Sequence, residues 1–282
     1  MTTKPRVSVL TPIYNTNPVY LREMIESVLT QTFTDFEFLI LNDSPDNTEI
    51  EKIVKSFKDK RIKYLKNNKN IGISNSRNKL LQMANGEYLA IFDHDDISEP
   101  TRLEKQVAYL DANPNVGVVS SWVEKFGDKN FIYKTPESDI LIKMFLTENN
   151  YVMHTAAMIR KSVLVDNDIK YEPEYFPAED YRLWERLMNK TSFHNIQEVL
   201  VKYRLDRTMT SVQKKQEMAI MHDKVSYEIR NMFPAYHIEY MKHFDNHTHM
   251  RVRLFGIIPL FKLKNNKIYL FEFIPIAKLR WK

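Results

Sequence analysis

Residues 88–96 are Tyr88-Leu89-Ala90-Ile91-Phe92-Asp93-His94-Asp95-Asp96, an apolar run that ends directly in three carboxylates. The apolar part predicts a buried strand with the acidic residues at its carboxyl end. Apolar runs of similar length precede it, and each is separated from the next by a segment with helical periodicity. Such alternation predicts parallel strands joined by right-handed crossovers, and hence an open α/β sheet flanked by helices.

The remaining predicted elements follow the same logic. Strands are expected at residues 6–10, 36–41 and 62–65, with helices at 18–29, 50–57 and 74–83 between them. Asn17-Pro18 offers an N-cap and first-turn pair for the first helix. After residue 150 the strand pattern weakens, although a helix begins near Ala178-Glu179-Asp180 and a strand is expected at 198–203. We expect an α/β domain over residues 1–210, a helical extension over 211–248 and a basic amphipathic tail over 249–282.

Composition restricts the class of protein. The 282 residues are 43% hydrophobic, which is enough to form a core. The absence of cysteine excludes disulfides, thiolate metal sites and a cysteine nucleophile, and it fits a reducing compartment. No apolar h-region follows Met1, and the apolar run Leu254–Phe261 is too short to cross a bilayer. We therefore expect a cytoplasmic location.

Polar residues follow three of the predicted strands. The first strand leads into Thr11-Pro12-Ile13-Tyr14-Asn15, the second into Asn42-Asp43-Ser44 and the fourth into residues 93–96. Because open α/β sheets bind ligands beyond the carboxyl ends of their strands, these side chains are expected to share one ligand-binding edge.

Phosphate binding would need a cation in this chain. It has only five glycines and neither a GxGxxG nor a GxxxxGK[ST] loop. Mg²⁺ or Mn²⁺ is commonly held by one or two carboxylates together with substrate phosphates, and Asp93 and Asp95 are suitably placed. The alternative is that these acidic residues only form a turn or a helix cap.

An ordered series of motifs resembles the family 2 glycosyltransferases with the GT-A fold. The series spans roughly residues 5–205 and consists of residues 7–15, 26–33, 42–44, 70–72 with Arg77-Asn78, 86–88 and 93–96. The resemblance implies a GT-A-like, mostly parallel sheet. Two departures stand out: Asn42-Asp43-Ser44-Pro45 replaces the usual Asp-Asp-Gly-Ser, and Asp206 replaces a histidine after Tyr203-Arg204.

The resemblance also implies residues that contact the nucleotide. Thr11, Pro12 and Tyr14 would lie at the base pocket, with the tyrosine ring against the base. Asp43 would accept a hydrogen bond from N3–H of uracil, which favours a UDP-sugar donor. Two arginines have alternatives: Arg77 lies near the nucleotide or is a solvated helix residue, and Arg204 faces the diphosphate or makes a buried ion pair.

Metal and catalytic roles are implied in the same way. Asp95 would ligate the metal directly, and Asp93 would contact the metal or the ribose. His154 would be a metal ligand or, as the alternative, a buried hydrogen-bonded histidine. Asp180 would be the general base of an inverting transfer, although an acidic residue also suits a helix N-cap.

The tail concentrates the positive charge. Residues 249–282 contain eight Lys/Arg and one Glu, so they carry +7 while the rest of the chain carries −2. Residues 254–264 are repeated at 270–280, each unit being a short apolar segment that ends in basic residues. This pattern suits two strands of a hairpin or two interfacial segments on an anionic membrane, and the alternative is packing on the catalytic domain or on a second subunit. Nucleic-acid binding is not expected.

These features predict transfer of a hexosyl or N-acetylhexosaminyl group from a nucleotide sugar to a glycan or lipid-linked glycan. The setting that the family resemblance implies is surface polysaccharide or lipooligosaccharide synthesis in a bacterium, and the basic tail suggests the inner face of the cytoplasmic membrane. A homo-oligomer is a further possibility that the sequence leaves open. Two rival functions are a sugar-1-phosphate nucleotidyltransferase, which normally starts with a glycine-rich loop that this chain lacks, and a non-catalytic membrane-associated scaffold.

Overall fold

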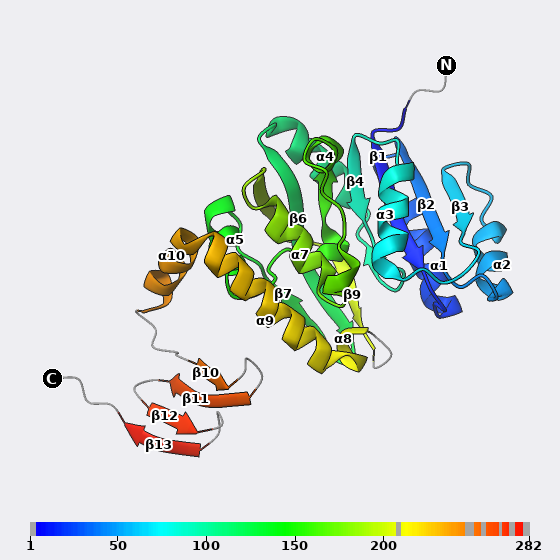
Figure 1. Cartoon of the computed structure of the whole chain (residues 1–282). Coiled ribbons are helices and arrows are strands. Elements are labelled where there is room, and N and C mark those ends of the chain that lie inside the picture. Colours follow the sequence, from blue (N-terminus) through cyan, green and yellow to red (C-terminus); the bar gives the residue numbers. More distant parts are fainter. Residues whose placement is uncertain are drawn as a thin grey trace.

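The computed structural model describes residues 4–206 and 210–245, together with four short strands between residues 251 and 278 (Figure 1). A nine-stranded sheet forms the centre of the larger part, in the order β3-β2-β1-β4-β8-β6-β9-β5, with β7 paired to β6. A separate four-stranded sheet follows in the tail.

The first half of the sheet has the predicted alternation. Its parallel strands are β1 (Val7–Ile13), β2 (Phe36–Asn42), β3 (Ile62–Lys66) and β4 (Tyr88–Ile91). The helices between them are α1 (Pro18–Leu29), α2 (Thr48–Ser56) and α3 (Ile73–Met83). The predicted cap of α1 is confirmed, since Asn17 Oδ1 accepts a hydrogen bond from the Val19 amide and Pro18 opens the helix.

The second half is mixed. Strands β5 (Ile97–Ser98), β6 (Val116–Gly127), β7 (Phe131–Tyr133), β8 (Met158–Arg160) and β9 (Ser192–Leu205) complete the sheet. β8 is antiparallel to both β4 and β6, whereas β6 and β9 are parallel. The sequence pattern missed β6 because its apolar run is interrupted by Ser120 and Ser121, which are nevertheless buried.

Helices and two hydrophobic clusters cover the sheet. The helices of this half are α4 (Arg102–Ala112), α5 (Asp139–Leu146), α6 (Lys161–Val165) and α7 (Glu179–Leu187), with 3₁₀ turns η1 (His154–Ala156) and η2 (Pro173–Tyr175). Successive residues of β1 belong to different clusters: Val9 packs with Phe92, and Leu10 packs in the cluster that contains Trp184. The sheet is therefore buried on both faces, which explains its nearly continuous apolar strands.

The helical extension shares the core of the α/β domain. It comprises α8 (Thr210–Gln213), α9 (Lys215–Met232) and α10 (Pro234–Asp245). Val225 and Ile229 of α9 are fully buried, in the same cluster as Trp184 of α7. The predicted helical segment is present, and α9 contributes directly to the main core.

The tail forms two repeated hairpins. Its antiparallel strands are β10 (Arg251–Leu254), β11 (Ile258–Lys264), β12 (Lys267–Leu270) and β13 (Ile274–Lys278). The strand registers repeat with the sixteen-residue period, since Arg251 lies opposite Lys262 and Lys267 lies opposite Lys278. The prediction that the units 254–264 and 270–280 form the two strands of one hairpin is therefore wrong, because β12 lies between β11 and β13 in the sheet. Both hairpins become irregular beside a proline, a residue that has no amide hydrogen for the ladder.

No helix in the described ranges is both long enough and apolar enough to cross a bilayer.

Candidate active site

The carboxyl ends of β2, β1 and β4 lie side by side in the sheet (Figure 1). Asn42 is in register with Ile13, and Ile91 is in register with Leu10. The segments that follow these strands therefore begin at the same edge, as predicted. This edge receives the residues expected at the base pocket, Asp43 and the acidic loop 93–96.

Asp43 is buried and already hydrogen-bonded. Its carboxylate accepts from Asn67 Nδ2 at 2.7 Å and from the amides of Ile71 and Gly72 at 2.9 Å each. Gly72 has a φ of 82°, a conformation that suits glycine, and it precedes α3 directly. Asp43 thus fixes the turn before α3, and any contact with a base would be additional to this role.

The three residues expected at the base pocket differ in exposure. Thr11 and Pro12 are buried within β1, whereas the side chain of Tyr14 is 51% exposed. The next residue, Asn15, donates its amide hydrogen to Ser44 Oγ at 3.1 Å, which ties this turn to the end of β2. Tyr14 is therefore the residue of the three that presents a ring to solvent.

Arg77 is buried between two carboxylates. Its Nη2 lies 3.0 Å from Asp93 Oδ1 and its Nη1 lies 2.6 Å from Glu179 Oε1. Burial by itself lowers the pKa of Arg77, but Asp93 and Glu179 raise it above the usual value, so the guanidinium stays charged. The alternative of a solvated helix residue is wrong: Arg77 bridges the acidic loop and the start of α7.

The three carboxylates of the acidic loop have different electrostatic environments. Burial raises the pKa of Asp93, yet Arg77 and His154 outweigh it and the pKa falls below the usual value. Burial and the neighbouring Asp93 raise the pKa of Asp95. Burial raises the pKa of Asp96 well above the usual value, together with Asp95 and Asp93. A bound cation would relieve this repulsion, because it favours the ionised forms.

The acidic loop suits a metal shared with substrate. Within the described part of the chain, no group of three or more His, Asp or Glu side chains is arranged to hold a metal ion. Mg²⁺ and Mn²⁺ sites in nucleotide-binding enzymes commonly use one or two carboxylates, with phosphate and water completing the shell. Asp95 and Asp93 fit that donor set.

Arg204 anchors the acidic loop to β9. Its amide donates to Asp96 Oδ1 at 2.9 Å and its Nε donates to the Asp95 carbonyl at 2.8 Å. Its Nη2 pairs with Glu23 at 2.5 Å, and its guanidinium lies 4.0 Å from the Tyr20 ring centroid. An ion pair of Arg204 is thus present, but it is only partly buried, because the Glu23 side chain is 43% exposed. Asp96 caps no helix, since α4 begins only at Arg102.

His154 is a buried, hydrogen-bonded histidine. Its Nε2 lies 2.8 Å from the Tyr171 hydroxyl. Burial, with a contribution from Arg77, lowers the pKa of His154 to about 3. The ring is therefore neutral at pH 7, and Nε2 is engaged by Tyr171. This geometry matches the structural alternative for His154 more closely than a metal ligand.

Asp180 is the second residue of α7. Its Oδ1 accepts from the Tyr181 amide at 2.7 Å, and its Oδ2 accepts from Asn150 Nδ2 at 2.9 Å. The N-cap alternative is wrong, because the cap position is occupied by Ala178. Burial raises the pKa of Asp180, although Arg77 opposes that rise. A carboxylate with a raised pKa accepts a proton more readily, as a general base requires.

Three further residues of this region were not predicted. Glu179 pairs with Arg77, Tyr171 contacts His154, and Asn150 contacts Asp180. The sequence could have indicated Glu179, because this carboxylate directly precedes the candidate residue Asp180. The pairing of Asn150 with Asp180 joins residues 30 positions apart, and no local pattern indicates it.

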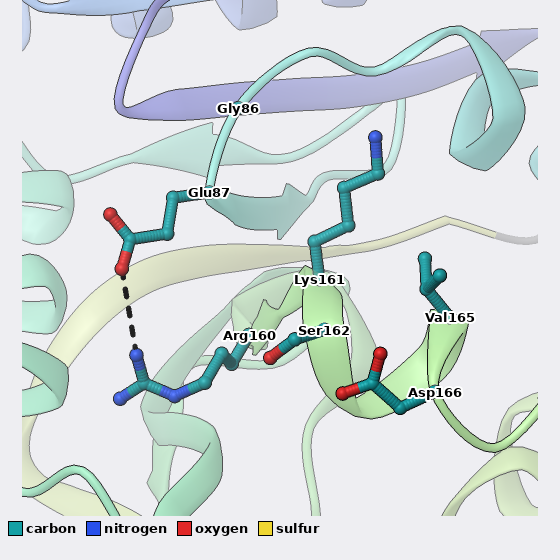
Figure 2. A pocket seen from close by; sticks show the side chains of 7 residues that line it. All are labelled: Gly86, Glu87, Arg160, Lys161, Ser162, Val165 and Asp166. Atoms are coloured by element: carbon teal, nitrogen blue, oxygen red, sulfur yellow. Dashed lines mark ion pairs between the residues drawn. The ribbon is translucent and has the colours of Figure 1, made fainter.

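A second hollow lies at the opposite end of β4 (Figure 2). Its lining residues are Gly86, Glu87, Arg160, Lys161, Ser162, Val165 and Asp166. Arg160 pairs with Glu87 at 3.6 Å, and Lys161 Nζ donates to the Ala84 carbonyl at 2.5 Å. This hollow contains none of the predicted site residues. It also lies at the amino end of β4, whereas ligands of open α/β sheets bind at the carboxyl ends.

The fold and site together define a class. The open α/β sheet, with Asp43 and the acidic loop at the carboxyl ends of its parallel strands, has the fold of the GT-A glycosyltransferases. Residues 8–167 match the family model described as Glycosyl transferase family 2, so the chain belongs to that family.

Curated relatives agree with this assignment. The chain is 37% identical over 222 residues to an uncharacterized glycosyltransferase of Methanocaldococcus jannaschii, covering 75% of this chain and 76% of the relative. It is 28% identical over 258 residues to the UDP-Gal:alpha-D-GlcNAc-diphosphoundecaprenol beta-1,3-galactosyltransferase of Escherichia coli, covering 89% and 90% of the two chains.

Solved structures share the fold. S. aureus TarS in complex with UDP-GlcNAc has a TM-score of 0.68 at 21% identity, covering 85% of this chain and 73% of TarS. The Pyrobaculum calidifontis mannosyltransferase PcManGT in complex with GDP-Man and Mn²⁺ has a TM-score of 0.61 at 18% identity, covering 87% of this chain and 72% of PcManGT.

Proposed function

We propose that this glycosyltransferase transfers a hexosyl or N-acetylhexosaminyl group from a UDP-sugar to a glycan hydroxyl, with inversion and with a divalent metal. The observation that carries the proposal is the bridge from Asp93 through Arg77 to Glu179. It fixes an acidic loop suited to a metal-bound diphosphate relative to Asp180, the candidate base.

Asp95 and Asp93 would hold Mn²⁺ or Mg²⁺. When bound, the cation would neutralise the diphosphate and stabilise the charge that develops on the leaving group. Arg204 supports this site by anchoring the loop backbone from β9. His154 is assigned a structural role in the proposal, because its Nε2 contacts Tyr171.

Asp180 would activate the acceptor. Its carboxylate would take the proton of the acceptor hydroxyl while the hydroxyl oxygen attacks C1 of the donor sugar. The bond between C1 and the diphosphate oxygen breaks at the same time, and the electron pair leaves with the diphosphate. Attack opposite the leaving group inverts the configuration at C1, and no covalent enzyme intermediate is needed.

A uridine donor is supported by two residues of the site and by two similar proteins. Tyr14 presents a ring at the edge of the sheet, and Asp43 lies at the end of the adjacent strand. TarS was solved with UDP-GlcNAc, and the Escherichia coli relative uses UDP-Gal. PcManGT was solved with GDP-Man, so a guanosine donor is the comparison that the experiment must include.

A membrane-borne acceptor is supported by the tail and by one relative. The tail carries a net charge of +7, and in the strand register Lys264 lies opposite Lys267, which lies opposite Lys278. A cluster of basic residues favours an anionic membrane surface. The Escherichia coli relative is named for a diphosphoundecaprenol-linked acceptor. We therefore propose that the enzyme acts at the inner face of the cytoplasmic membrane, in the synthesis of a surface glycan.

A donor panel tests the reaction. Wild type and Asp180→Asn are incubated with UDP- and GDP-sugars, with Mn²⁺ or with a chelator, in the presence of lipid-linked glycan acceptors. We expect UDP release that needs both the metal and Asp180. Turnover that ignores chelation would refute metal dependence, and release of pyrophosphate from a sugar phosphate and UTP would indicate the nucleotidyltransferase. A wild type without turnover would indicate the scaffold.

A further inference from the structure

The loop between α5 and η1 connects the candidate base to the helical extension. Asn150, in the middle of this loop, donates from Nδ2 to Asp180 Oδ2 at 2.9 Å. The orientation of the amide is determined by its other side, because Asn150 Oδ1 accepts from the Val152 amide at 3.1 Å. The NH₂ group must then face the Asp180 carboxylate.

Each oxygen of Asp180 thereby has one donor. The Tyr181 amide contacts Oδ1 and Asn150 contacts Oδ2, so the plane of the carboxylate is fixed. A carboxylate oxygen accepts more than one hydrogen bond, which leaves capacity for an incoming hydroxyl. Both donors also favour the ionised form, which is the form that acts as a base.

Helix α7 also holds the beginning of the loop. The Tyr181 hydroxyl donates to the Leu146 carbonyl, which is the last residue of α5. The two ends of residues 146–150 are therefore attached to consecutive residues of α7, namely Tyr181 and Asp180.

Helix α9 contacts residues 147–149 of the same loop. Arg230 Nη1 donates to the Thr147 carbonyl and to Glu148 Oε1, both at 3.2 Å. His222 Nδ1 lies 3.1 Å from Asn149 Oδ1. Because Val225 and Ile229 of the same helix are buried in the main core, these contacts come from a fixed support.

We infer that Asn150 is a positioning residue for Asp180, and that helix α9 holds Asn150 in place by bracing residues 147–150. The inference rests on the proposed role of Asp180 as base. It makes the helical extension part of the catalytic unit, although no residue of α9 needs to touch the substrate.

Two substitutions at one position distinguish positioning from packing. Asn150→Ala removes the donor, while Asn150→Asp keeps the size and shape of the side chain and places a second carboxylate against Asp180. We expect kcat to fall roughly 10- to 100-fold in Asn150→Ala, a loss typical of a misplaced catalytic group. It should fall further in Asn150→Asp, with the Kd for UDP and Mn²⁺ unchanged in both. A packing role predicts the opposite order.

The support from α9 is tested by Arg230→Met, with Arg186→Met as control because Arg186 lies on the exposed side of α7. Arg230→Met should lower kcat, while the Kd for UDP stays unchanged and the unfolding midpoint changes too little to explain the loss. Arg186→Met should match wild type.

If Asp180→Asn is inactive but Asn150→Ala, Asn150→Asp and Arg230→Met keep the wild-type kcat, this inference is overturned while the proposed function stands. If Asp180→Asn keeps full activity, the proposed base is wrong.

Discussion

Arg77 holds together the two acidic segments of the site. Its positive charge compensates the carboxylate of Asp93, in the loop after β4, and that of Glu179, in the first turn of α7. A buried ion pair adds little net stability compared with an apolar replacement of the whole group, but removal of one partner leaves an uncompensated charge. Here one guanidinium serves two carboxylates, so its loss would affect both segments.

Arg77→Met is therefore expected to lower the free energy of unfolding by about 3–5 kcal/mol, the usual cost of breaking a buried pair. Urea unfolding followed by circular dichroism measures it. Arg22→Met is the control, because Arg22 is an exposed arginine of α1. Equal stability of the two variants would show that Asp93 and Glu179 do not depend on Arg77.

His154 predicts a pH dependence of stability. Its pKa is lowered to about 3 in the folded protein by burial, whereas the unfolded chain has the ordinary value near 6.5. The unfolded state therefore binds a proton first as the pH falls, and stability decreases between pH 6.5 and 3. At pH 5 this loss is about 2 kcal/mol relative to pH 7.

The measurement compares urea unfolding of wild type and His154→Gln at pH 7 and pH 5, with a chelator present. Other groups that titrate in this range are common to both proteins, so the difference isolates the histidine. A wild type that loses no more stability than His154→Gln on acidification would contradict the assignment of a neutral buried ring.

At the scale of elements, α9 is a structural part of the α/β domain. Its apolar side chains enter the cluster around Trp184, and its polar side chains reach the loop that holds Asp180. Its periodicity indicated a helix. The sequence alone could not show which surface that helix covers, because its partners are α7 and the loop at Thr147, which Arg230 contacts across 83 positions.

Ile229→Ala tests this packing. Ile229 is fully buried, and replacing a buried isoleucine by alanine leaves a cavity. The free energy of unfolding should therefore fall by about 2–5 kcal/mol. Ile238→Ala on α10 is the matched control, since Ile238 is 53% exposed and should change stability little. Chemical denaturation should show one cooperative transition for both variants. A separate early transition confined to Ile229→Ala would mean that α9 folds independently of the α/β domain.

At the scale of the whole molecule, the net charge is unevenly distributed: residues 249–282 carry +7, and the rest of the chain carries −2. The strand register places Lys264, Lys267 and Lys278 at directly opposite positions of three neighbouring strands. Basic residues near an anionic membrane contribute about 1 kcal/mol each. The tail is therefore where the proposed membrane contact should be strongest.

The triple variant Lys264→Gln, Lys267→Gln, Lys278→Gln should bind anionic liposomes about 100-fold more weakly, from the loss of about 3 kcal/mol. Flotation with phosphatidylglycerol vesicles measures it, and the binding of wild type should decrease with salt. A triple replacement of exposed Lys52, Lys60 and Lys69 by Gln removes the same charge from the body. Equal weakening by both triple variants would place the contact outside the tail.

The sequence by itself determined the parallel half of the sheet, the helix that begins at Asn17-Pro18 and the edge that collects Tyr14, Asp43 and Asp93. These features depend on local periodicity, caps and the direction of parallel strands, all of which are written in short stretches of the chain. The sixteen-residue repeat of the tail was visible for the same reason.

Only the tertiary structure decided which side chains pair with the charged residues of the site. Arg77 meets Glu179 across 102 positions, and Arg204 meets Glu23 across 181. Asn150 faces Asp180 only because α7 and α9 hold its loop from two sides. Such contacts arise where separate elements pack together, so no local pattern specifies them. They nevertheless determine which of the predicted site residues remain free for a substrate.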